Sequence, residues 1–253
     1  MGEKTMTNLQ AVLFDLGDTL VDLGEGRGDY EAHVQVRAGR VYDALTAAGV
    51  ALDERPAFCV ILAHESEAGY RNATARQVGI DIYDVLADFF AKRGQPLTDE
   101  LVRMAGDAYC RRSGDHAPLR PGAIETLTAL RARGLSLGII SNTIQPARHM
   151  DDGLVLRGLA GYFPVRIYSS TARVAKPHPQ IFRAALDAIG VAPEGAAYVG
   201  DRLRADVAGA QAVGMKGILI EVAHRVEHDP AIKPDALIKE LPQLLGVLSQ
   251  WCG

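Results

Sequence analysis

The chain has 253 residues, which is enough for one large domain or a domain with an insertion, and its 48% hydrophobic and 23% charged residues are typical of a globular protein. The net charge of -4 argues against nucleic acid as a partner, because a phosphate backbone is bound by a basic surface. The sequence lacks the run of about 18 apolar residues that a membrane-spanning helix needs, so no membrane partner is expected.

The cysteines and the amino-terminal segment predict the compartment. Cys59, Cys110 and Cys252 lie far apart and match neither a disulfide framework nor the spacing of a zinc site, which favours a reducing compartment. The polar start MGEKTMTN lacks the apolar core of a secretion signal, and Met6 stands where a myristoylation motif has Ser or Thr. We therefore expect a cytoplasmic protein. The sequence makes no prediction of its oligomeric state.

Short apolar segments of the kind that form buried strands recur along the chain. They lie at 11–15, 135–141, 165–169, 196–200, 216–220 and, more weakly, 236–238. From residue 122 onward these segments alternate with stretches of helical periodicity. Nearly continuous apolar strands separated by amphipathic helices are typical of a parallel sheet that is covered on both faces. The sequence therefore predicts an α/β fold with a doubly wound parallel sheet.

Residues 22–115 interrupt this alternation, because they carry only helical spacing. Three apolar stripes follow one another there: Val34, Ala38, Val41 and Leu45; Ile82, Val85, Leu86, Phe89 and Phe90; Leu101, Val102, Ala105, Ala108 and Tyr109. They predict an inserted helical domain at 22–115 and a core domain made of 1–21 and 116–253. The connecting segments, at 23–28 and 113–122, contain Gly and Pro and are either a hinge or plain surface connections.

Polar side chains follow four of the predicted strands, at the point where each apolar pattern stops. In the order of the chain they are Asp15, then Ser141 and Asn142, then Lys176, then Asp201 and Asp206. In a doubly wound sheet, ligands bind beyond the carboxyl ends of the strands, so these groups should meet in one crevice. Carboxylates bind Mg²⁺, while the side chains of Lys, Ser and Asn can donate to phosphoryl oxygens. The pattern predicts a site for a hard cation and a phosphate group.

Four segments that contain these residues resemble the ordered motifs of the haloacid dehalogenase superfamily. They are FDLGDTL at 14–20, IISNT at 139–143, KPHPQIF at 176–182 and VGDRLRADVAGA at 199–210. Most members of this superfamily are Mg²⁺-dependent phosphatases, and its subfamily I places a helical C1-type cap between the first two motifs, where the helical insertion falls. The resemblance spans the whole chain. It implies a Rossmann-like core with a helical cap and a hydrolase that acts on a small phosphorylated metabolite.

The resemblance also implies catalytic roles for the motif residues. Asp15 would be the nucleophile, which attacks phosphorus to form an aspartyl-phosphate. Ser141 would hydrogen-bond a phosphoryl oxygen, with support from Asn142. Lys176 would neutralise the charge of the phosphoryl group and hold Asp15 ionised. Thr19 would orient the first loop.

A magnesium site is the second implication of the resemblance. Asp15 and Asp201 would bind Mg²⁺ directly, together with the backbone carbonyl of Gly17. Asp206 would join through water or by positioning Asp201. Without the metal, the nucleophilic carboxylate would repel an anionic phosphate.

Position 17 departs from the family's pattern. Most phosphatases of the superfamily carry a second aspartate there, which protonates the leaving group and then activates water, and Gly17 cannot transfer a proton. General acid–base catalysis contributes about 10²–10⁴ in rate, so its loss is felt most with a poor leaving group. Asp18 is the nearby carboxylate that could substitute or reach the substrate. Capping of turn amides is the favoured interpretation of Asp18.

Gly17 keeps three alternatives open. The founding dehalogenases also lack the second aspartate, but they need no metal and their fourth motif differs from the one here. A phosphomutase of the same subfamily would depend on the missing acid more heavily than a phosphatase. A catalytically silent protein that binds metal and phosphate belongs to another functional class, although every other catalytic group is present. The favoured interpretation is a Mg²⁺-dependent phosphatase.

In this family, substrate selection comes from the cap, which closes over the crevice. The candidate residues are Arg27, Tyr30 and Arg71, and an arginine there could bind a second anionic group of the substrate. Outside the motif positions with assigned roles, Arg202 and His224 are expected to be solvated.

Overall fold

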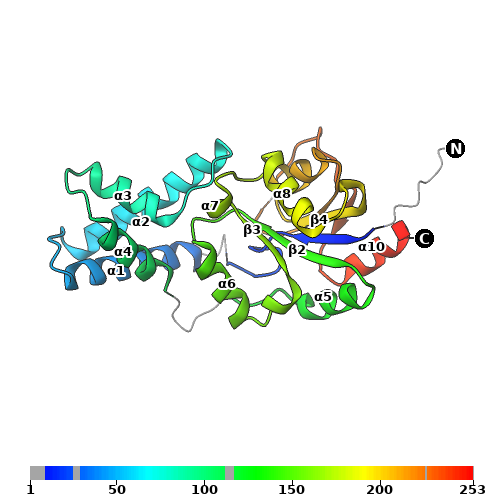
Figure 1. Cartoon of the computed structure of the whole chain (residues 1–253), viewed down its shortest axis with the longest axis horizontal. Helices are drawn as coiled ribbons and strands as arrows, with labels where there is room; N and C mark the ends of the chain where they lie inside the picture. Colours follow the sequence, from blue (N-terminus) through cyan, green and yellow to red (C-terminus); the bar gives the residue numbers. More distant parts are fainter. Residues whose placement is uncertain (1–8, 25–28, 112–116, 226, 253) are drawn as a thin grey trace.

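The computed structural model describes residues 9–24, 29–111, 117–225 and 227–252, and at 29–31 and 252 it describes the backbone alone. One part of the molecule is a sheet covered by helices, and the other is a group of four helices beside the carboxyl ends of the strands (Figure 1). This confirms the α/β fold with a helical insertion after the first strand.

Six strands form one parallel sheet. They are β1 (Ala11–Phe14), β2 (Ser136–Ser141), β3 (Val165–Tyr168), β4 (Ala196–Gly200), β5 (Lys216–Ile220) and β6 (Ala236–Ile238). Their order across the sheet is β3-β2-β1-β4-β5-β6. Because β1 lies between β2 and β4, the residues that follow these three strands emerge side by side at one edge of the sheet.

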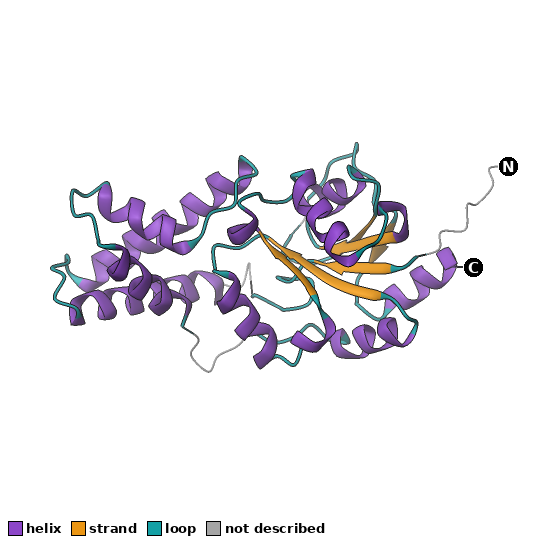
Figure 2. Ribbon diagram, in the orientation of Figure 1, coloured by secondary structure: helices purple, strands orange, loops and turns teal. Residues whose placement is uncertain are grey.

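Helices cover both faces of the sheet (Figure 2). The helices that come after the insertion are α5 (Ala123–Ala132), α6 (Ala147–Leu156), α7 (Ser169–Ala172), α8 (Pro179–Ile189), α9 (Gly209–Gln211) and α10 (Gln243–Cys252), with short turns at Ala160–Tyr162 and Pro193–Gly195 and a π-helical turn at Leu203–Ala208. Side chains alternate along a strand. Val12 and Phe14 therefore pack with α5, α6 and α10, while Ala11 and Leu13 pack with α8.

The insertion consists of four helices with an apolar core of their own. They are α1 (Asp29–Ala47), α2 (Arg55–Ala75), α3 (Ile82–Ala91) and α4 (Asp99–Cys110). The three predicted stripes lie on α1, α3 and α4. The sequence analysis missed α2, because exposed Val60 and Ile61 stand next to buried Cys59 and Leu62 in the run FCVILA and hide the helical period.

Backbone hydrogen bonds join the insertion to the rest of the molecule. At its base, the backbone N–H of Asp22 donates to the carbonyl of Pro118 at 2.9 Å. Further along, the N–H of Ile82 at the start of α3 donates to the carbonyl of Ile144, beyond β2, at 2.8 Å. The insertion is thus held at a point away from its two connections as well as at its base.

The predicted connecting segments lie partly outside the described residues. The domain bounds 1–21, 22–115 and 116–253 therefore stay a proposal, and so does a hinge at these connections. The separate apolar core of the four helices supports the proposed division.

No helix in the described ranges is both long and apolar enough to cross a bilayer. Cys59 and Cys110 are buried, and neither takes part in a disulfide.

Candidate active site

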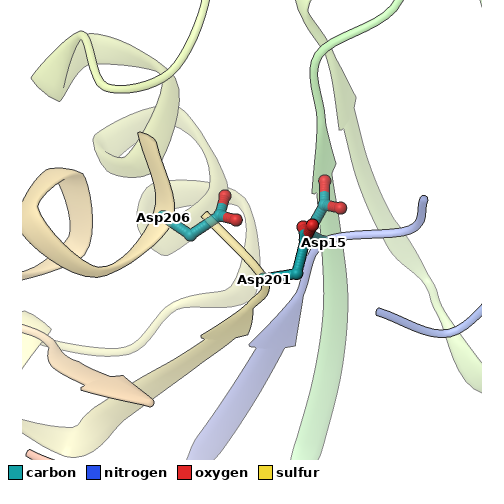
Figure 3. A group of neighbouring side chains, drawn as sticks. All are labelled: Asp15, Asp201 and Asp206. Atoms are coloured by element: carbon teal, nitrogen blue, oxygen red, sulfur yellow. The ribbon is translucent and has the colours of Figure 1, made fainter. Parts of the chain in front are cut away.

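Three carboxylates meet at the carboxyl ends of the two central strands. Asp15 directly follows β1, Asp201 directly follows β4, and Asp206 lies in the π-helical turn after it. Each residue offers a carboxylate oxygen that lies within 4.8 Å of the others (Figure 3). The structure thus brings together the three acidic residues that the sequence analysis placed at the metal site.

Lys176 connects two of these carboxylates and a buried tyrosine. Its Nζ lies 2.7 Å from Asp15 Oδ1 and 2.7 Å from Asp206 Oδ1, and it donates to the hydroxyl of Tyr198 at 2.8 Å. That hydroxyl in turn donates to the carbonyl of Ile140 at 2.7 Å. Because an ammonium group has three N–H bonds, these partners use all of them.

The charges on Asp15 and Lys176 depend on burial and on each other. Burial raises the pKa of Asp15; Lys176 lowers it and Asp206 raises it, and the net change is upward. Burial alone would lower the pKa of Lys176, but Asp15 and Asp206 hold that pKa well above its usual range. Lys176 therefore favours the ionised form of Asp15, but burial and Asp206 together outweigh it, so its predicted role in holding Asp15 ionised stays a prediction.

Asn142 positions Lys176 through the backbone. Its Nδ2 donates to the carbonyl of Lys176 at 3.0 Å, and its Oδ1 accepts from the N–H of Lys176 at 2.8 Å. Ser141 ends β2 and lies buried at the wall of the same cavity as Asp15. Thr19 is buried with no hydrogen-bond partner for its hydroxyl within the described part of the chain, so the predicted role of its side chain in the loop stays a prediction.

Asp206 is held by the backbone as well as by Lys176. Its Oδ2 accepts from the N–H of Arg202 at 2.9 Å. A Cβ on Gly200 would lie 2.3 Å from Asp206 Cγ, so a side chain at the end of β4 would displace this carboxylate. Both oxygens of Asp206 thus already accept hydrogen bonds, and neither is hydrogen-bonded to Asp201.

The surroundings of Asp201 differ from those of Asp206 in their hydrogen bonds. Both of its carboxylate oxygens are buried without a hydrogen-bond partner among the described residues, although Oδ2 forms an ion pair with Arg225. Carboxylate oxygens in this state are costly to bury and are suited to a metal ion. Together with Asp15 and Asp206, they match the oxygen ligands that Mg²⁺ takes, so the residues present fit a magnesium ion.

The side chain of Leu23 lies close to the place that a side chain at position 17 would take. A Cβ at this position would lie 2.6 Å from Cδ1 of Leu23. Both residues border the cavity. A side chain at position 17 therefore requires the end of the Leu23 side chain to shift.

Asp18 contacts the loop after β5. Its φ is 56°, and its Oδ1 accepts from the N–H of Leu23 at 2.9 Å, which is the predicted capping of a turn amide. Its Oδ2 lies 3.4 Å from Nε2 of His224 and 3.3 Å from Nη2 of Arg225. His224 is exposed, as expected for a surface histidine, but its ring also lies against Asp18.

A cavity of about 1170 Å³ opens above these residues, between the strand ends and the insertion. Asp15, Ser141 and Lys176 line it from the sheet side, and Arg71 lines it from the insertion. Arg27 lies outside the described residues, and only the backbone of Tyr30 is described, so their roles stay predictions.

The sequence analysis missed three residues of the site: Tyr70, Tyr198 and Arg225. Tyr198 lies inside an apolar strand, where a tyrosine looks like core, and Tyr70 lies on the helix that was not predicted. Burial is the main cause that raises the pKa of Tyr70 to about 12, and the charges of Arg202, Asp15 and Lys176 also act on it. Arg202 is exposed as expected, but it borders the cavity.

Curated relatives of this chain include phosphatases. It is 31% identical over 251 residues to the glyceraldehyde 3-phosphate phosphatase of Pyrococcus furiosus, a match that covers 98% of this chain and 96% of the relative. It is 36% identical over 145 residues to the phosphoserine phosphatase of Thermus thermophilus, which is 57% of each chain.

Solved structures share the fold over nearly the whole chain. The 2-haloacid dehalogenase of Pseudomonas syringae superposes with a TM-score of 0.70 at 23% identity, covering 96% of this chain and 99% of the other. A phosphatase of Thermococcus onnurineus superposes with a TM-score of 0.62 at 27% identity, covering 95% and 98%. The family model for haloacid dehalogenase-like hydrolases matches residues 9–214, and the chain belongs to this family of hydrolases.

Proposed function

We propose that this protein is a Mg²⁺-dependent phosphatase that hydrolyses a small phosphorylated metabolite through an aspartyl-phosphate on Asp15. The observation that carries this proposal is the placement of a buried ammonium group between Asp15 and Asp206, with the carboxylate of Asp201 close to both acids and without a hydrogen-bond partner among the described residues. This arrangement offers one carboxylate to attack phosphorus, one side-chain cation for the phosphoryl oxygens, and a pair of carboxylates for a metal.

In the first half of the proposed reaction, an oxygen of Asp15 attacks phosphorus. The new bond joins this oxygen to phosphorus, the bond from phosphorus to the ester oxygen breaks, and its electron pair leaves with the alcohol oxygen. Lys176 is held on the side of Asp15 by Asn142 and Tyr198, where its charge offsets that of the phosphoryl oxygens. The buried hydroxyl of Ser141 borders the same cavity and would donate to one of these oxygens.

In the second half, water attacks the phosphorus of the aspartyl-phosphate, which releases phosphate and restores Asp15. Gly17 supplies no group that could protonate the departing alcohol or deprotonate this water. The alcohol oxygen would take its proton from solvent in the cavity. We therefore expect the protein to favour esters whose alcohol is already a good leaving group.

Asp15 and Asp201, with the backbone carbonyl of Gly17 and with Asp206 nearby, would hold the magnesium ion. Bound there, the ion would offset the negative charge that a phosphate group brings to Asp15. Because burial keeps the pKa of Asp15 above its ordinary value, an added positive charge would also favour the ionised nucleophile.

The charges around the cavity favour an anionic substrate. Although the whole chain carries a net charge of -4, nine lysine and arginine side chains and four carboxylates line the cavity among the described residues. A local excess of positive charge attracts anions regardless of the net charge of the protein. The names of the relatives in Pyrococcus furiosus and Thermus thermophilus make glyceraldehyde 3-phosphate and phosphoserine the first substrates to test.

Part of this positive charge comes from the insertion. Arg37, Arg40 and Arg111 all line the cavity. Burial lowers the pKa of Arg40, and the charges of Arg37 and Arg111 lower it further, which shows that the three guanidinium groups lie near one another. We propose that this group, together with Arg71, contacts the part of the substrate that lies away from the phosphate.

The experiment that tests the proposal is an assay with p-nitrophenyl phosphate and Mg²⁺, with EDTA as the control. The good leaving group of this ester needs little protonation, so turnover is expected in spite of Gly17. A panel of phosphorylated metabolites, including those two esters, then identifies the substrate class. If there is no turnover on any phosphate ester, but metal-independent release of chloride from 2-chloropropionate, the protein is a dehalogenase. If neither activity is found, the protein is catalytically silent.

A further inference from the structure

A positively charged side chain already occupies the Asp201 side of the proposed metal site. Arg225 belongs to the loop after β5, and only 10% of its side chain is exposed. One guanidinium nitrogen forms an ion pair with Asp201 Oδ2, and the other lies 3.3 Å from Asp18 Oδ2. The guanidinium group therefore bridges two buried carboxylates that come from different loops.

The two carboxylates that contact Arg225 differ in whether they can bind a metal ion. Asp201 is one of the three residues whose oxygens lie close enough to hold a metal ion, and Asp18 is not in that group. Asp18 is also fixed by the N–H of Leu23 and faces His224. Asp18 can thus keep hold of Arg225 when Asp201 turns to another cation.

We propose that Arg225 is a positioning residue that neutralises the charge of Asp201 in the metal-free protein. When Mg²⁺ binds Asp201, it displaces Arg225, which keeps its ion pair with Asp18. This inference rests on the magnesium site of the proposed function. The guanidinium group and the metal ion compete for Oδ2 of Asp201, so the affinity for Mg²⁺ depends on how firmly Asp18 retains Arg225. The unusual aspartate at position 18 then acts through Arg225 on the metal site, without touching the metal.

The test measures the binding of Mg²⁺ alone, by titration calorimetry of the full chain without substrate. Arg225→Gln removes the competing charge and should tighten Mg²⁺ binding about tenfold or more, because even a screened unit charge at this range is worth a few kcal/mol. Asp18→Asn removes the carboxylate that competes with Asp201 for Arg225 and should weaken binding about tenfold. Arg225→Lys keeps the charge and should stay close to the wild-type protein.

Because Arg225→Gln should raise the affinity for Mg²⁺ and Asp18→Asn should lower it, the two variants distinguish this role from a merely structural one. Both substitutions break the same ion pair between Asp18 and Arg225, so damage to the loop alone would change the affinity in the same direction in both variants. Arg204→Gln is the matched control, because Arg204 borders the same cavity but is exposed and pairs with Asp229. It should leave the affinity within twofold of the wild-type value.

The outcomes also separate this inference from the proposed function. If Mg²⁺ binds the wild-type protein and all variants equally, or shifts in the same direction in both Arg225→Gln and Asp18→Asn, the role of Arg225 is overturned and the metal site stands. If no protein binds Mg²⁺, including Arg225→Gln, the metal site is overturned and this inference with it. A melting temperature for each metal-free variant shows that the comparison is made between folded proteins.

Discussion

The two sides of Asp15 differ in how their charges are satisfied. On one side, Lys176 has three partners, and both oxygens of Asp206 are committed. On the other side, the described residues offer Asp201 no hydrogen bond, and it forms an ion pair with an arginine from a loop. The groups on the Lys176 side thus satisfy one another, whereas the Asp201 side is the one where we propose that a metal ion binds.

The elements that position Lys176 and Arg225 also differ. Lys176 is held by Asn142, which directly follows β2, and by Tyr198 within β4. Arg225 belongs to the loop that follows β5. A site that must bind and release a cation and a substrate needs one rigid side to align the nucleophile and one adjustable side to exchange ligands.

Replacing the nucleophile has the largest expected effect, because both sides act through it. Asp15→Asn should lower turnover of p-nitrophenyl phosphate by at least about 10³-fold, since an amide cannot form the acyl-phosphate bond. The fold should persist, because the volume is unchanged and Lys176 keeps Asp206. Steady-state kinetics and a thermal melt measure the two expectations. Turnover within tenfold of the wild-type rate would show that another group attacks phosphorus.

Removing the ammonium group breaks the rigid side. Lys176→Met leaves Asp15 and Asp206 buried without a cation, and we expect a loss of about 3–5 kcal/mol in the free energy of unfolding. Turnover should fall by about 10²-fold or more. Urea denaturation measures the stability.

The matched control for this variant is Lys216→Met, because Lys216 forms an exposed ion pair with Asp235 at 2.8 Å. Its loss should cost less than about 1 kcal/mol. Equal destabilisation by the two substitutions would contradict the distinction between a buried charge network and a surface pair.

Restoring the missing acid sharpens the comparison at position 17. Gly17→Asp alone should bring little gain, because Leu23 occupies the space of the new side chain. Gly17→Asp combined with Leu23→Ala should raise the rate with alkyl phosphates by about tenfold, while p-nitrophenyl phosphate should change less because its leaving group needs no proton. Leu23→Ala alone is the control. A double variant without this difference between substrates would mean that proton transfer does not limit the reaction.

Removing one hydroxyl from the rigid side has the smallest expected effect. Tyr198→Phe deletes an acceptor of Lys176 and a donor to Ile140, and we expect a loss of about 1–2 kcal/mol in stability with a several-fold loss of turnover. Tyr168→Phe is the control, because its hydroxyl donates to Asp151 at 2.8 Å at the edge of the sheet. It should cost a similar amount of stability and leave turnover unchanged. A loss of turnover in both variants would mean that the effect of Tyr198 is one of stability alone.

Much of the fold could be predicted because local patterns encode it. Apolar strands in alternation with amphipathic helices predict a covered parallel sheet, and the apolar stripes predict three of the four helices of the insertion. Helix α2 could not be found in this way, because its exposed Val60 and Ile61 adjoin its buried face. The prediction failed where apolar residues outnumber those that the core can bury.

The sequence by itself determined which polar groups stand at the strand ends. Asp15, Ser141 and Asp201 stand at the ends of apolar segments whose direction and adjacency are set by the parallel sheet, so their meeting is a consequence of local structure. Only the tertiary structure decided which partners these groups have. The pairing of Asp18 and Asp201 with Arg225 depends on the path of a loop, and the filling of the space beside Gly17 by Leu23 depends on packing, and neither leaves a periodic signal in the chain.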